Sequence, residues 1–175
     1  MRLFIALDLG REIEKECERL QELLPEKGIT KTRRYHLTLA FLGEVQPAVM
    51  EKVKYALQTI SQKKFMIQTT SLGVFPSKKY PRVIWVGVDS TQELYELQKA
   101  IDDVLKPLHL PTSNDFHPHI TLARVKLPEQ RNELLEKVKT ISVTKIVTSI
   151  IYFILFESIH ANGKEYKELL RVSLQ

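Results

Sequence analysis

The chain has 175 residues, 43% of them hydrophobic and 27% charged, which supports a packed core and excludes disordered or fibrous proteins. The formal net charge of +5 and the sequence pI near 9.2 form a mild basic excess that suits an anionic partner, such as a phosphate ester or a short RNA. The single cysteine, Cys17, excludes internal disulfides and multi-cysteine zinc sites and favours a cytoplasmic location. The longest apolar run, residues 150–156, is too short to cross a bilayer, so no membrane partner is expected.

Apolar spacing along the chain predicts strands that interleave with helices. The expected strands span residues 2–8, 35–43, 65–75, 82–88, 119–125, 141–156 and 165–174. The expected helices span residues 11–24, 47–61, 91–106 and 129–139. Cys17 falls on the apolar stripe of the first helix and is expected in the core, and Asn162 with Gly163 favours a tight hairpin turn. This order of elements indicates an α+β or α/β sheet protein.

One internal repeat divides the chain into two halves. The string HLTLAFLGEV begins at His36 and HITLARVKLP begins at His119, so the copies start 119 − 36 = 83 residues apart, close to half the chain. This spacing is too long for a solenoid repeat. It predicts a single two-lobed domain over residues 1–175, with two similar lobes related by a pseudo-twofold axis and one histidine strand in each.

The repeated tetrapeptide places a histidine beside a threonine. Alternate residues of a strand share a face, so His36 points the same way as Thr38, and His119 the same way as Thr121. A twofold axis would bring two imidazoles and two hydroxyls into one cleft. One imidazole can then take a proton from an attacking water while the other protonates the leaving oxygen, and the hydroxyls can bind the non-bridging phosphate oxygens. Because both rings start from a pKa of about 6.5, we expect a bell-shaped pH profile with a maximum near neutrality.

The strings HLTL at His36 and HITL at His119 resemble the paired HxTx motifs of the two-histidine phosphoesterases. Within that superfamily the chain is most similar to the RNA 2′,3′-cyclic phosphodiesterases, also called 2′-5′ RNA ligases. The resemblance implies a bilobal α+β fold, in which two antiparallel sheets line a central cleft and the helices lie outside. It implies that a monomer opens 2′,3′-cyclic phosphate ends of RNA to 2′-phosphomonoesters without metal or other cofactor, with reversible 2′-5′ ligation in some members. It also implies that His36 donates the proton and His119 accepts one, although the motifs alone leave these roles interchangeable.

Three further residues lie near the motifs. Arg124 follows His119 by five residues, and strict alternation puts it on the opposite face unless the strand ends or bulges, so a phosphate contact and a surface ion pair both stay open. Phe41 holds the equivalent place after His36, where a core position is favoured over base stacking. His117 is expected in a loop, because Pro118 interrupts strand pairing.

The remaining polar candidates are expected at the surface. His109 and His160 fall near predicted turns and have no partner motif. The cluster Lys78, Lys79, Tyr80 and Arg82 is typical of a solvated loop, with an RNA path as the alternative.

Two rival functions stay open at this point. Two histidines can bind zinc, but zinc sites usually have three or four protein ligands, and threonine occupies the alternate positions of both motifs. A non-catalytic nucleotide- or RNA-binding module of the same fold is the second rival, although both histidines are present. A small cyclic phosphodiester is also possible as the substrate of the enzyme.

Overall fold

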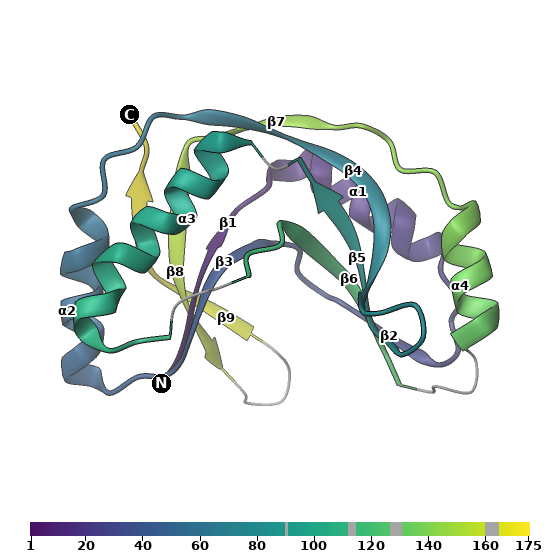
Figure 1. Ribbon diagram of the computed structural model, residues 1–175, viewed down its shortest axis with the longest axis horizontal. Coiled ribbons are helices and arrows are strands. Elements are labelled where there is room, and N and C mark those ends of the chain that lie inside the picture. The colour runs from purple at the N-terminus through teal and green to yellow at the C-terminus, as the bar shows by residue number, and fades with distance from the viewer. Residues whose placement is uncertain (90, 112–114, 127–130, 160–164) are drawn as a thin grey trace.

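The computed structural model describes residues 1–89, 91–111, 115–126, 131–159 and 165–175 (Figure 1). In chain order the elements are β1 (Arg2–Leu7), α1 (Gly10–Leu23), β2 (Ile29–Lys31), β3 (Leu37–Glu44), α2 (Pro47–Gln58), β4 (Phe65–Pro76), β5 (Pro81–Val88), α3 (Gln92–Leu105), a 3₁₀ turn (Lys106–Leu108), β6 (His119–Val125), α4 (Arg131–Thr140), β7 (Val147–Ile150), β8 (Tyr152–Ile159) and β9 (Glu165–Ser173). His160 and the turn expected at Asn162 and Gly163 lie outside the described residues.

The strands pair antiparallel in the order β7-β4-β5-β6-β3-β1-β8-β9, and β2 pairs with the end of β6. Two four-stranded halves meet at the centre, where Leu37 of β3 and Ile120 of β6 form the single residue pair that joins them in the described part of the chain. Figure 1 shows the halves as the two sides of an arch. The expected α+β fold of helices and antiparallel strands is confirmed, and the two expected sheets are joined edge to edge as halves of one nine-stranded sheet.

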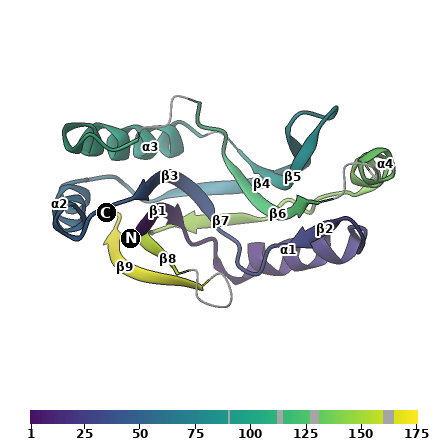
Figure 2. The same ribbon diagram turned by 90° about the horizontal axis from the view of Figure 1, so that it is seen from below.

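The order of elements repeats between the halves. The sequence β1-α1-β3-α2 in the first half corresponds to β5-α3-β6-α4 in the second. In Figure 2, α1 and α3 lie on opposite sides of the sheet, and α2 and α4 lie at its two ends. Helix α1 of the first half contacts β6 and β7 of the second half. Helix α3 of the second half contacts β3 of the first half as well as β4 of its own half.

The core is built from the apolar stripes that the sequence predicts. Ile13, Cys17 and Leu20 of α1 are fully buried at helical spacing, which confirms the core position of the cysteine. Five of the six residues of β1, Leu3–Leu7, are buried as well, because that strand lies between β3 and β8. Among the described helices, none combines the length and apolarity that a membrane crossing requires.

The expected strand over 141–156 is wrong in its first part and divided in its second. Residues 141–146 form no strand, because side chains bind their backbone: Thr69 Oγ1 donates to the Thr144 carbonyl at 2.8 Å and accepts from Ile146 N at 2.8 Å. Residue 151 separates β7 from β8. The short strand β2 was not expected, since three residues are too few to show an alternating pattern.

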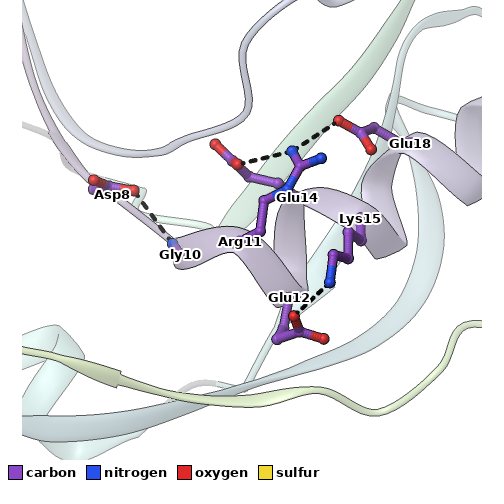
Figure 3. A network of polar contacts seen from close by, with 7 residues as sticks. All are labelled: Asp8, Gly10, Arg11, Glu12, Glu14, Lys15 and Glu18. Atoms are coloured by element: carbon purple, nitrogen blue, oxygen red, sulfur yellow. Dashed lines mark hydrogen bonds and ion pairs between the residues drawn. The ribbon is translucent and has the colours of Figure 1, made fainter.

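The outer face of α1 carries a network of ion pairs (Figure 3). Arg11 pairs with Glu14 at 3.5 Å and with Glu18 at 3.2 Å, and Lys15 pairs with Glu12 at 2.9 Å. All five side chains are at least one third exposed, so each pair contributes little to stability. Their effect is to neutralise one another on the surface of the helix.

Gln21 on the buried side of α1 ties the helix to both histidine strands. Its amide nitrogen donates to the carbonyl of Thr32 at 2.8 Å, in the segment that leads to β3, and to the carbonyl of Leu122 at 2.6 Å in β6. The Gln21 residue is only 8% exposed, so water does not readily replace these bonds.

We therefore expect Gln21→Leu to lower the free energy of unfolding by about 1–3 kcal/mol, because the substitution keeps the side-chain size but removes both hydrogen bonds. The Thr32 carbonyl then loses the Gln21 donor, and the Leu122 carbonyl keeps only the bond from Thr32 N. Urea unfolding followed by circular dichroism measures the change. Gln92→Leu, which removes an exposed bond to Glu96, is the matched control and should change stability by less than about 0.5 kcal/mol. Equal stability of the two variants would contradict the tie.

Candidate active site

His119 begins strand β6, and its ring is held by the residue two positions before it. The Nδ1 atom lies 2.6 Å from the His117 carbonyl oxygen. A carbonyl can only accept, so the Nδ1 atom carries the hydrogen and donates it. The neutral His119 ring therefore keeps Nε2 as its free, basic nitrogen. Pro118 between the two histidines is buried, and His117 lies in a loop as expected.

Aromatic rings surround His119. The Phe75 ring meets it edge-on with centroids 4.9 Å apart, and the Trp85 ring lies 6.1 Å away. Burial among these groups lowers the pKa of His119 below its ordinary value of 6.5. The hydrogen bond to the His117 carbonyl raises this pKa partly back, and the charge of the His117 ring lowers it again.

His36 immediately precedes β3 and lies in a second aromatic cluster. Its ring centroid is 5.2 Å from that of Phe4 and 5.3 Å from that of Tyr166, which meets it edge-on. Burial lowers the pKa of His36 to about 4, and the charge of His119 acts in the same direction.

The pairing of Leu37 with Ile120 arranges the four motif side chains. In an antiparallel pair, one step along each strand from this point sets Thr38 across from His119 and His36 across from Thr121. All four of these side chains are partly exposed, whereas the leucine and isoleucine residues between and beside them are buried. The alternation of partly exposed and buried side chains therefore agrees with an outward face and a core face in both motifs.

A β-bulge brings Arg124 to the face of His119. On β5, Ile84 pairs with Ala123 and the next residue, Trp85, pairs with Thr121, so β6 has one extra residue at Leu122. The bulge reverses the alternation, and Arg124 pairs with Val83, which shares the face of Trp85. Strict alternation does not hold at this point of β6, and the exception that the sequence left open for a bulge applies. Arg124 is exposed, and none of the described carboxylates forms an ion pair with it.

The same device turns Phe41 outward in the first half. On β1, Ile5 pairs with Ala40 and the next residue, Ala6, pairs with Thr38, so β3 also has an extra residue. Phe41 is 66% exposed as a result, and the core position favoured from the sequence is wrong. Each half thus presents histidine, threonine and one further residue to its cleft face, but that residue is Phe41 in one half and Arg124 in the other.

A pocket of about 390 Å³ opens beside these residues. Its walls are Thr38, Leu39, Ala40, Phe41, Phe75, Pro111, Asp115, Phe116, His117 and His119. The His117 ring in this wall was not expected from the sequence, and neither were the rings of Phe75, Trp85 and Tyr166 around the two histidines. The strings around His117 (FHPH, residues 116–119) and Trp85 (IWVG, residues 84–87) carry no periodicity that would distinguish an aromatic side chain in a cleft from one in the core.

The other sequence candidates lie as expected. His109 is exposed, and so are all four residues of the cluster Lys78, Lys79, Tyr80 and Arg82. Within the described ranges, no group of three or more His, Cys, Asp or Glu is placed to hold a metal ion, so the zinc alternative finds no ligand set there.

Comparison with known proteins agrees with this geometry. The family model of the 2′-5′ RNA ligase superfamily matches residues 9–151. The RNA 2′,3′-cyclic phosphodiesterase of Methanocaldococcus jannaschii is 34% identical over 142 residues, covering 79% of this chain and 80% of the relative. The enzyme of the same name from Thermotoga maritima is 31% identical over 176 residues, covering 90% and 94%. The crystal structure of E. coli LigT complexed with 3′-AMP superposes with a TM-score of 0.81 at 26% identity, covering 99% of this chain and 97% of LigT. The chain belongs to the 2′-5′ RNA ligase superfamily.

Proposed function

We propose that this protein is an RNA 2′,3′-cyclic phosphodiesterase that hydrolyses cyclic phosphate ends to 2′-phosphomonoesters. The observation that carries the proposal is the pair of partly buried imidazoles, one from each half, that meet across the Leu37–Ile120 pair with a threonine beside each. The relatives named above as RNA 2′,3′-cyclic phosphodiesterases support an enzyme over a binding module.

His119 is assigned as the general base. Its Nδ1 hydrogen is committed to the His117 carbonyl, so Nε2 is the atom that accepts a proton from the attacking water. As the proton leaves, the water oxygen forms a bond to phosphorus. The low pKa of the ring keeps it neutral, and therefore able to act as a base, near neutral pH.

His36 is assigned as the general acid. It donates a proton to the 3′ oxygen as the bond between that oxygen and phosphorus breaks, which leaves a 3′ hydroxyl and a 2′-phosphomonoester. The negative charge of a bound phosphodiester stabilises the imidazolium and so raises the pKa of His36 from its low value in the free protein. The substrate itself thus helps to charge the acid.

The remaining cleft residues bind the substrate. The hydroxyls of Thr38 and Thr121 and the guanidinium of Arg124 hold the non-bridging oxygens, where charge accumulates in the transition state. Phe41 offers its exposed ring to the base of the terminal nucleotide. Replacing the water by a 5′ hydroxyl turns the same chemistry into 2′-5′ ligation.

The proposal extends to the state of the protein in the cell. One chain supplies both histidines from a sheet that is continuous across its halves, so a monomer with a single two-lobed domain suffices. The fully buried, free Cys17 supports a reducing compartment, the cytoplasm. The partner is an RNA end that carries a 2′,3′-cyclic phosphate.

Removing either imidazole should lower kcat by about 10²- to 10⁴-fold, because each ring serves a separate proton transfer. The measurement compares His36→Ala and His119→Ala on a dinucleotide that ends in a 2′,3′-cyclic phosphate. His109→Asn, at an exposed histidine with a φ of 55° that asparagine tolerates, is the control and should keep full activity. Near-normal turnover by either alanine variant would contradict the paired mechanism.

A phosphodiester with a nitrophenolate leaving group separates the two roles. Nitrophenolate departs without protonation, so this substrate should restore His36→Ala much more than His119→Ala. The opposite order of rescue would exchange the two roles.

The pH optimum of kcat/KM should lie below 6.5, on the acidic side of the neutral optimum that unperturbed histidines predict. The rate rises with pH as the base loses its proton and falls as the acid loses its own, and in the free protein both pKa values are lowered. The optimum of kcat should lie higher, since bound phosphate raises both. Profiles measured between about pH 4 and pH 9 test this, and a kcat/KM optimum above about pH 7 would refute it.

Activity should survive EDTA, because proton transfers alone carry the proposed reaction. The assay compares turnover of the dinucleotide before and after dialysis against the chelator. Loss of activity that a divalent cation restores would count against the mechanism.

A further inference from the structure

The sheet surface of the second half is basic. Strands β2, β4, β5 and β6, with the turn between β4 and β5, contain no aspartate or glutamate. The same segments hold five cations, namely Lys31, Lys78, Lys79, Arg82 and Arg124. On α1, by contrast, each of the arginines and lysines drawn in Figure 3 is paired with a glutamate. Among the described residues, none of the five cations on the sheet surface forms an ion pair with a carboxylate.

The turn between β4 and β5, residues 77–80, stands at the rim of the pocket. It follows Phe75 by one residue, and Phe75 both lines the pocket and contacts the His119 ring. In Figure 2 the turn projects away from the sheet. An RNA strand that leaves the pocket past Phe75 would meet Lys78 and Lys79, both of which are exposed to solvent.

Tyr80 forms a small cluster with two cations at this turn. Its ring is 58% exposed, with Lys79 Nζ at 5.6 Å and the Arg131 guanidinium carbon at 5.8 Å from the ring centroid. Arg131 Nη1 also donates to the Lys79 carbonyl at 3.2 Å, which fixes the turn to α4. An exposed aromatic ring between cations combines the two elements that bind single-stranded nucleic acid, a stacking platform and phosphate partners.

The pocket itself is too small to hold more than the end of an RNA strand. Its volume of about 390 Å³ lies near the lower end of the range of about 300–1,000 Å³ typical of small-molecule sites, so it suits the terminal nucleotide. The nucleotides that precede a cyclic end must then lie outside, over one rim.

We infer that the turn 77–80, together with Arg131, binds the single-stranded RNA that precedes the cyclic phosphate end. The inference rests on the proposed function, and it specifies the substrate as an RNA strand, not a mononucleotide. Lys78, Lys79 and Arg131 contact phosphates of the strand, and Tyr80 stacks on one of its bases.

The test compares a dinucleotide with an octanucleotide, both ending in a 2′,3′-cyclic phosphate. Lys78→Ala/Lys79→Ala should lower kcat/KM for the octanucleotide on the order of tenfold and leave the dinucleotide unchanged, because two phosphate contacts are lost. The slope of log(kcat/KM) against log salt should fall by about 1.4. Tyr80→Leu should also weaken only the longer substrate. Lys63→Ala/Lys64→Ala, just before β4 and at the opposite end of that strand from the turn, is the matched control and should affect neither substrate.

Equal losses on both substrates, or no loss on the octanucleotide, would overturn the inference. Failure of the proposed function would look different, since the unaltered protein would then turn over neither substrate. In that case, fluorescence anisotropy with a labelled octanucleotide that ends in a 3′-phosphate still tests the turn. Weaker binding by the lysine variant than by its control supports the docking surface, whereas equal binding rejects it.

Discussion

The pairing of Leu37 with Ile120 is the contact on which the active site depends. It is the one described point where β3 and β6 meet, and the two histidines lie one residue before it on each strand. The pairing is supported by buried side chains on its core face and by Gln21, whose amide binds the segments beside both strands. The helices α1 and α3, on opposite sides of the sheet, add packing across the junction. A small shift between the halves would therefore separate the two imidazoles.

Near-symmetry of the fold supplies two similar imidazoles, and small differences make them unequal. His119 has a backbone acceptor that fixes its Nδ1 hydrogen, whereas the ring of His36 is enclosed by Phe4 and Tyr166. The bulges of β3 and β6 then place Phe41 and Arg124 at equivalent positions of the two halves. The half of the cleft with Phe41 is suited to a nucleobase, and the half with Arg124 is suited to a phosphate. A nearly symmetric fold thus favours one orientation of the substrate.

Much of the fold and the placement of the two histidines could be predicted from the sequence, because both rest on short patterns. The repeated HxT string and its period of two place four side chains on one face, and the structure keeps them there. The positions of Phe41 and Arg124 could not be predicted, since a bulge adds a residue to one strand without any change in the local pattern. The strand expected over 141–146 does not form for a related reason: Thr69, which is distant in sequence, binds the backbone of this segment.

In the proposed mechanism, His119 rests as a neutral base and His36 becomes the charged acid when substrate binds. Nitrogen-15 NMR of the two imidazoles measures these charge states most directly, with a cyclic phosphonate analogue of the nucleoside 2′,3′-cyclic phosphate that cannot be hydrolysed. In the free protein near neutral pH, we predict two neutral rings, with the hydrogen of His119 on Nδ1. Addition of the analogue should convert His36 to the imidazolium and leave His119 neutral. Two neutral rings in the complex, or a His119 hydrogen on Nε2, would contradict the account.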